Sequence, residues 1–318
     1  MTKPYMYFPF RPDIHLTEFL KTHPFTYSAE IIPPRNGAEQ MKVLTQVQQL
    51  MTAGAQFLSV TKGAGGSLRG GSLPISQLIK EQFKVPCTAH FTCRDLTVQE
   101  VENQLVDHHY FGIRNILALR GDPPEGQPEW KPREGGHLYA YQLIEQIRKL
   151  NEGIYLERAG GGPTHDSTPE KTQFCIGAAA YPDYPDEKRR IEYFKLKVEA
   201  GAHFAITDMI YDSDSYARFL DQTAREGAQI PILPGARVLK SQKQALRMMS
   251  KFKTVIPKNF FNQLPEEEIE GSFPQALDAF LQLVERLKRA GAPGIHLFVV
   301  VDTQSAVIAL QTLTGSSL

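Results

Sequence analysis

The chain has little of what marks disulfide-rich, membrane-spanning or nucleic-acid-binding proteins. It contains three cysteines and one tryptophan among 318 residues, and 35 basic side chains balance 35 acidic ones. Balanced charge argues against a nucleic-acid partner, which basic surfaces bind. No apolar run approaches the roughly 18 residues that a membrane helix needs. The first residues include no apolar signal region, so we expect a cytoplasmic protein with no membrane contact.

The cysteines and histidines indicate neither a disulfide nor a metal site. Cys87 and Cys93 fall on one predicted strand, roughly 20 Å apart, and cannot bridge each other. With Cys175 they are expected to be buried free thiols in a reducing compartment. No His-x-x-x-His or Cys-x-x-Cys spacing is present, so we expect no metal. His108 and His109 follow each other on a predicted helix and are expected to be solvated.

Strand-like and helix-like segments alternate along most of the chain. Between the apolar strand runs lie segments with helical periodicity, such as 38–53 and 273–290. In 38–53 the residues predicted to share the buried face are Met41, Leu44, Val47, Leu50 and Met51. The eight predicted strands are 25–32, 57–61, 86–93, 115–120, 173–180, 204–211, 230–234 and 294–301.

The same short glycine-alanine motif recurs where predicted helices end and strands begin. A glycine beside alanine stands there at Gly54, Gly201, Gly227 and Gly291, and glycine after a last helical turn accepts the left-handed conformation that ends a helix. The repeated unit is therefore strand, loop, helix and again strand, which predicts a parallel sheet covered by helices.

Eight such units predict an α/β fold, a single-domain (βα)8 TIM barrel over residues 25–318. A doubly wound open sheet is disfavoured because no Gly-x-Gly-x-x-Gly turn follows the first strand. Residues 1–24 are expected to be a lead-in packed on the barrel. The segments 122–136 and 154–172 are expected to be long loops, which tend to be functional or mobile.

Six predicted strands end in a polar residue where an apolar run stops. In a parallel barrel these ends meet at one mouth, where such barrels place their active sites, so the pattern predicts an enzyme. The six residues are Glu30, Thr61, His90, Asp122, Tyr181 and Asp208.

Two carboxyl groups among the six have a chemical rationale. Burial of Glu30 would raise its pKa and make it a proton donor near neutral pH; the alternative is a glutamate bound to an arginine inside the barrel. Asp122 follows Gly121, which lets a ligand approach the backbone. Its carboxylate either accepts N–H groups of a heterocycle or caps the next loop, and spacing alone leaves both open.

Two further segments carry positive charge near the predicted mouth. A glycine-rich loop follows Thr61 and acts either as a phosphate cradle or as a flexible lid; Lys62 and Arg69 favour an anionic ligand. A basic helix spans 188–197 and is expected to present a solvated face. Its last cation, Lys197, directly precedes the helix end, and we consider it as an exception to this solvated face.

Several short phrases together resemble the methylenetetrahydrofolate reductase family and run in family order across roughly residues 25–245. They are Glu30–Arg35 (EIIPPR), Ser59–Ala64 (SVTKGA), Ala89–Cys93 (AHFTC), Ile116–Pro124 (ILALRGDPP), Ala179–Pro182 (AAYP), Lys197–Ala202 (KVEAGA) and Ala205–Thr207 (AIT).

The resemblance implies a barrel flavoprotein that passes hydride from NADH or NADPH through FAD to methylenetetrahydrofolate in ping-pong turnover. It implies that Glu30 is the acid that protonates the folate nitrogen and that Asp122 lies near flavin and pterin. Gln244 is implied to contact the substrate, and Asp208 stands at a substrate-side position. With Lys62 from the glycine-rich loop, the expected cofactor contacts are Thr61, Lys62, Ala64, His90, Arg120, Gly121, Asp122, Ala140, Tyr181 and Lys197.

Departures from the family pattern concern mainly the folate side. The family commonly has Gln at position 208, Pro-Gly-Ile-x-Pro where this chain has 234–238, a histidine where this chain has 183–186, and an arginine near 301–304. A carboxylate in place of an amide changes both hydrogen bonding and charge. The alternatives are therefore a reductase of a related methylene-pterin or a non-redox pterin-binding subunit. The sequence leaves the choice of nicotinamide and a homo-oligomer open.

Overall fold

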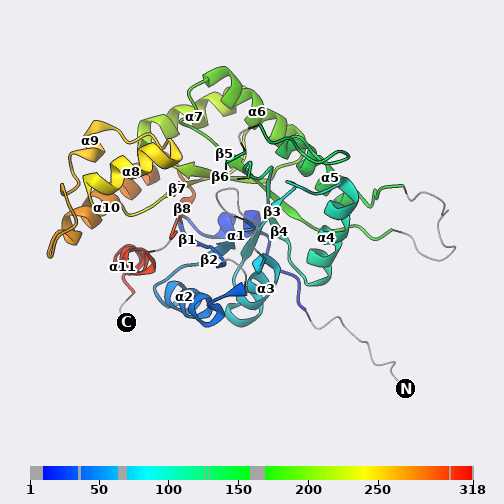
Figure 1. Ribbon diagram of the computed structural model, residues 1–318, viewed down its shortest axis with the longest axis horizontal. Coiled ribbons are helices and arrows are strands. Elements are labelled where there is room, and N and C mark those ends of the chain that lie inside the picture. Colours follow the sequence, from blue (N-terminus) through cyan, green and yellow to red (C-terminus); the bar gives the residue numbers. More distant parts are fainter. Residues whose placement is uncertain are drawn as a thin grey trace.

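The computed structural model describes residues 10–34, 37–63, 70–124, 126–127, 129–157, 169–300 and 302–316. Eight parallel strands form a closed barrel in chain order, with helices around it (Figure 1). The predicted (βα)8 barrel and all eight predicted strands are confirmed. The strands are β1 (Thr26–Ile31), β2 (Phe57–Val60), β3 (Cys87–Thr92), β4 (Asn115–Leu119), β5 (Cys175–Ala180), β6 (Phe204–Met209), β7 (Ile232–Ala236) and β8 (Gly294–Leu297).

The barrel closes where β1 pairs with β8, and a glycine makes that contact close. Thr26 is the register partner of Gly294. A Cβ atom at position 294 would lie 2.1 Å from the Thr26 hydroxyl and 2.4 Å from its carbonyl oxygen. A larger residue at 294 would therefore push the first and last strands apart.

Helices follow the strands and cover the outside of the barrel (Figure 1). Predicted segments 38–53 and 273–290 correspond to α2 and α10. The helices are α1 (Leu16–Thr22), α2 (Gln40–Thr52), α3 (Ser72–Phe83), α4 (Val98–Tyr110), α5 (Ala140–Glu152), α6 (Glu187–Glu199), α7 (Ser213–Arg225), α8 (Gln242–Phe252), α9 (Lys258–Phe261), α10 (Phe273–Arg289) and α11 (Thr303–Thr314).

Alternate residues of each strand face the helices or the barrel interior. On β3, Ala89 and Phe91 belong to an apolar cluster with side chains of α4 and α5, whereas His90 and Thr92 line an interior cavity. This is the division that the period of two predicts. It places polar side chains inside the barrel without interrupting the packing of the helices.

The described part of the lead-in closes the amino end of the barrel. Leu16 of α1 is fully buried and packs with inward-facing residues such as Phe57 and Phe204. The Asp13 carboxylate accepts hydrogen bonds from the Cys87 amide and the Asn115 side chain, both at 3.0 Å. An apolar layer thus seals this end, and the opposite end is left for ligands.

Replacing Leu16 with alanine is expected to lower the free energy of unfolding by about 2–5 kcal/mol, because it leaves a cavity in this layer. The control is Met41→Ala, whose side chain is 72% exposed and should change stability by less than about 0.5 kcal/mol. Urea unfolding of both variants measures the difference. Equal stability of the two variants would contradict the sealing role of Leu16.

Three expectations about individual side chains were wrong. Met41 lies in the first turn of α2 outside its buried stripe, which Val43, Val47 and Leu50 form. His108 is not solvated: it packs edge-on against Phe91 at 5.5 Å between ring centroids. His109 is partly covered and also lies edge-on, 5.9 Å from the Phe174 ring.

Among the described residues, no group of three or more His, Cys, Asp or Glu side chains could hold a metal ion. None of the described helices is long and apolar enough to cross a membrane. The three cysteines are buried and free, as the sequence predicted.

Candidate functional site

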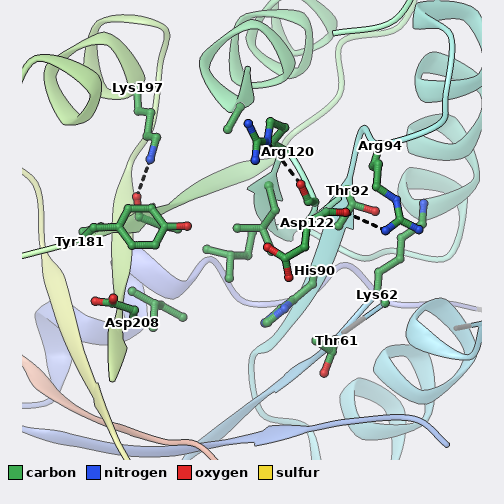
Figure 2. Close-up of a pocket in the computed structure, with 18 of the residues that line it drawn as sticks. Thr61, Lys62, His90, Thr92, Arg94, Arg120, Asp122, Tyr181, Lys197 and Asp208 are labelled. Atoms are coloured by element: carbon green, nitrogen blue, oxygen red, sulfur yellow. Dashed lines mark hydrogen bonds between the residues drawn. The ribbon is translucent and has the colours of Figure 1, made fainter. Parts of the chain in front are cut away.

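A cavity of about 1090 Å³ opens at the carboxyl ends of the strands. It lies opposite the end that α1 closes, and its lining includes residues of β1, β3, β4, β5, β6 and β8 and Thr61 directly after β2. The structure brings all six predicted strand-end residues together in its wall, although they are up to 178 positions apart in sequence. Figure 2 labels all of them except Glu30. They are Glu30, Thr61, His90, Asp122, Tyr181 and Asp208.

Most of the other predicted site residues lie in the same wall: Lys62, Arg120, Gly121, Ala140 and Lys197. Ala64 and Arg69 fall outside the described residues. Gln244 is not in the cavity lining; its side-chain oxygen accepts a 2.7 Å hydrogen bond from the Lys240 amide at the start of α8. Its contact with substrate stays a prediction.

Glu30 lies on β1 and is buried, which raises its pKa to about 8. His90 lies beside it, with 4.0 Å between Oε1 of Glu30 and Nδ1 of His90. Burial lowers the pKa of His90 to about 3, so this imidazole is neutral and does not stabilise a carboxylate. No arginine among the described residues pairs with Glu30. The side chain therefore carries a proton at neutral pH.

The His90 ring is unsatisfied in the protein alone. Both of its nitrogens are buried and have no hydrogen-bond partner among the described residues. Buried polar atoms in native proteins nearly always have a partner. Because His90 lines the cavity, a bound ligand or water is the natural partner.

A second histidine, His296 on β8, forms part of the cavity wall and was not predicted. Its Nδ1 lies 2.8 Å from the Ser28 hydroxyl and its Nε2 lies 3.1 Å from the Ser59 hydroxyl. Burial lowers its pKa to a value of about 3. Its inward position could have been inferred from the period of two along the apolar run of β8.

Lys197 is a buried cation of the basic helix, and it lines the cavity. It is buried on α6, and its ammonium donates a 2.8 Å hydrogen bond to the Ala179 carbonyl (Figure 2). The ammonium also lies 5.1 Å from the centre of the Tyr181 ring. Burial lowers the pKa of Lys197 to about 8. No carboxylate among the described residues pairs with this ammonium.

The sequence predicted that the rest of the basic helix is solvated, and this prediction was wrong for two of its residues. Lys195 does lie outside and pairs with Glu226 at 3.2 Å. Arg189 and Arg190, however, line the cavity with Tyr193. Spacing alone could not separate them from Lys195, because one helix presents both faces within two turns.

Asp208 continues the inward side of β6 next to an irregularity in the pairing with β7. The Thr207 hydroxyl there donates to the Asp208 carbonyl at 2.6 Å and accepts from the Gly235 amide at 2.8 Å. The Asp208 side chain is exposed to the cavity, yet the surrounding walls desolvate it. This burial, with a smaller contribution from nearby Asp183, raises its pKa to about 7.

Lys62 adds a further cation to the opposite wall. Its ammonium donates a 2.5 Å hydrogen bond to Gln104 and lies 4.0 Å from the centre of the Phe91 ring. Burial lowers its pKa to about 8. Cations such as Lys62, Arg120 and Lys197 can hold phosphate oxygens, and carboxyl groups such as Asp122 and Asp208 can hold N–H edges of a heterocycle.

Fold and cavity together define a (βα)8 barrel protein whose mouth suits an anionic, heterocyclic ligand. The chain matches the family described as "Methylenetetrahydrofolate reductase" over residues 15–314. It therefore belongs to the methylenetetrahydrofolate reductase family, as the sequence motifs predicted.

Relatives of the chain include long and short proteins. It is 30% identical over 289 residues to "Methylenetetrahydrofolate reductase 1" of Schizosaccharomyces pombe, covering 89% of this chain and 44% of the relative. It is 29% identical over 290 residues to "Methylenetetrahydrofolate reductase (NADH) 1" of Zea mays, covering 90% of this chain and 48% of the relative. The chain thus spans about half the length of these two proteins.

A shorter relative and a solved structure match over most of their length. "5,10-Methylenetetrahydrofolate reductase" of Escherichia coli is 28% identical over 295 residues, which cover 90% of both chains. A solved structure, "Uncharacterized protein from Clostridium thermocellum binds two copies of 5-methyl-5,6,7,8-tetrahydrofolic acid", has a TM-score of 0.58. At 14% identity, with 95% of this chain and 99% of that chain covered, this likeness shows the fold alone.

Proposed function

We propose that the protein is an FAD-dependent oxidoreductase that reduces methylenetetrahydrofolate to methyltetrahydrofolate with a reduced nicotinamide. The observation that carries the proposal is Glu30: a buried carboxyl group, protonated at neutral pH, in the wall of a large cavity. The family membership supplies the substrate class. NADH is the favoured donor because the maize and Arabidopsis thaliana relatives carry it in their names.

The residues present fit FAD. The unsatisfied His90 ring can hydrogen-bond a ligand in the cavity, and Lys62, Arg120 and Lys197 supply positive charge for a pyrophosphate. Bound FAD would accept hydride from the nicotinamide and supply it to the methylene carbon of the substrate. The chain's own part is to bind, orient and protonate.

Glu30 would transfer its proton to the folate nitrogen that leaves the methylene carbon as the five-membered ring opens. One hydride and one proton then account for the methyl group and the new N–H bond. Because the layer around Leu16 closes the amino end, Glu30 would recover its proton from solvent through the cavity mouth. Asp122 and Asp208 would accept hydrogen bonds from the N–H groups of the pterin.

Asp208 favours a second candidate, a reductase of a related methylene-pterin. At this position the family resemblance predicts a neutral amide, whereas this chain has a carboxyl group whose pKa is raised to about 7. The C. thermocellum protein with the same fold is described as binding 5-methyltetrahydrofolic acid, which keeps the reduced folates as the first ligands to try.

The test is turnover by the purified protein. We expect it to carry FAD, released on denaturation. Under anaerobic conditions it should oxidise more than one NADH per flavin only when methylenetetrahydrofolate is present. Methyltetrahydrofolate should form in equal amount. Protein with bound FAD that reduces a methylene-pterin lacking glutamate, but not the folate, would favour the second candidate. Protein without flavin would contradict the proposal.

Reduction of the folate is expected to decline as pH rises through about 8, because Glu30 loses its proton there. Above that pH the rate of the folate half-reaction should fall about tenfold per pH unit, the slope of a single required proton. Flavin reduction by NADH needs no acid and is the control. A parallel decline in the rates of both half-reactions would assign the pH dependence to Lys62 or Lys197. A decline centred near the ordinary glutamate pKa of about 4.3 would contradict the raised pKa.

A further inference from the structure

Asp95, which follows β3, connects two side chains beside the cavity. Its Oδ2 accepts a 2.8 Å hydrogen bond from Nε of Arg94, and its Oδ1 accepts a 3.1 Å hydrogen bond from the indole of Trp130. Trp130 belongs to the long loop after β4, so this carboxylate ties that loop to the end of β3. Arg94 and Asp95 both line the cavity.

Arg94 in turn holds the segment that carries Asp122. Its guanidinium donates a 2.7 Å hydrogen bond to the backbone carbonyl of Asp122 (Figure 2). The preceding Gly121 has a φ of +90°, and a Cβ atom there would lie 2.8 Å from the Cβ of Arg94. The turn is therefore packed tightly onto Arg94, and its position depends on where Arg94 lies.

The Asp122 carboxylate has no hydrogen bond or ion pair within the part of the chain that the structure describes, and its side chain is exposed to the cavity. Arg94 is buried and positively charged. Without the Asp95 carboxylate, the buried guanidinium would lack a negatively charged partner, which is unfavourable. We expect it then to pair with the carboxylate of Asp122, the residue whose backbone it already contacts.

Backbone strain at Asp95 fits a functional placement. Its φ is +63°, in the left-handed region that non-glycine residues rarely adopt. Such conformations persist where the surrounding contacts require them, and they cluster at functional sites. Here the left-handed turn accompanies a carboxylate that bonds Arg94 and Trp130 at once.

We propose that Asp95 is a positioning residue for Asp122. The Asp95 carboxylate neutralises the Arg94 guanidinium and holds it on the backbone carbonyl of Asp122. Because Arg94 is already paired, the Asp122 carboxylate stays free to bind the N–H edge of the substrate. The catalytic consequence rests on the proposed function, whereas the structural consequence does not. Asp95 acts through Arg94 and touches no reacting atom in this account.

The test compares Asp95→Asn with Asp107→Asn, a matched change on the exposed face of α4. Asparagine tolerates the left-handed conformation, so the Asp95 variant is expected to fold and to keep FAD. A crystal structure of this variant should show the Arg94 guanidinium paired with the Asp122 carboxylate. Arg94 remaining on the Asp122 carbonyl alone, with the carboxylate free, would overturn the proposal whether or not the protein reduces folate.

Kinetics supply the second readout. The Asp95→Asn change should slow the folate half-reaction about tenfold or more, since small displacements of a binding group are costly, and leave flavin reduction by NADH at the control rate. If Asp95 acts only through Arg94, adding Asp95→Asn to Arg94→Gln should slow the folate half-reaction no further than Arg94→Gln does alone. A double variant clearly slower than Arg94→Gln would show that Asp95 does not act through Arg94. Failure of the unaltered protein to reduce folate would contradict the proposed function and leave the crystallographic comparison decisive for Asp95.

Discussion

Replacing Glu30 with glutamine is expected to slow the reduction of methylenetetrahydrofolate by about 100-fold or more, because a general acid contributes a rate factor of roughly that size. Glutamine has nearly the same shape and fills the same buried site beside His90. It can donate a hydrogen bond but has no proton to transfer at neutral pH. Flavin reduction by NADH should continue at the unaltered rate, because that step needs no proton from Glu30.

Stopped-flow absorbance at the flavin band, with the two half-reactions measured separately, checks this result. The matched control is Glu285→Gln, an exposed carboxylate that pairs with Arg289 on α10 at 3.1 Å. This control should leave both half-reactions unaltered. Survival of folate reduction in the Glu30 variant would show that Glu30 is not the acid.

Replacing Lys197 with methionine is expected to weaken FAD binding by about 100-fold, the loss typical for removing one member of a buried charge contact. The ammonium is buried, and its partners among the described residues are the Ala179 carbonyl and the Tyr181 ring. A buried cation without an anion is unfavourable. A phosphate of the cofactor would therefore pair with the Lys197 ammonium. Methionine keeps the apolar stem and fills most of the same space.

Titration of the apoprotein with FAD, followed by quenching of flavin fluorescence, measures this affinity. Lys195→Met provides the control on the same helix, since Lys195 pairs with Glu226 on the outer surface. It should bind FAD with unaltered affinity. Equal affinities of the two variants would place the cofactor phosphates away from Lys197.

The eight strands and the cavity wall could be predicted because both depend on local sequence. Parallel strands buried on both faces appear as apolar runs, and Glu30 and Asp208 each stand next to the last residue of such a strand. Glycines such as Gly201 mark where helices end; this one has a φ of +119°. These signals lie within a few residues of one another.

What could not be predicted depends on contacts between distant segments. The hydrogen bonds of His296 reach Ser28 and Ser59, more than 230 positions away, and Asp95 meets Trp130 across a loop. No local period reports either contact. His108 was expected to be solvated for the same reason: its cover, the Phe91 ring, comes from a neighbouring strand.

An anaerobic visible spectrum of the purified protein, recorded before NADH, after NADH and then after methylenetetrahydrofolate, follows both half-reactions in one sample. We expect a flavin spectrum that bleaches with NADH and returns with the folate, in protein whose Glu30 is intact. Bleaching without return would contradict folate as the acceptor, and a colourless protein would contradict the flavin chemistry altogether.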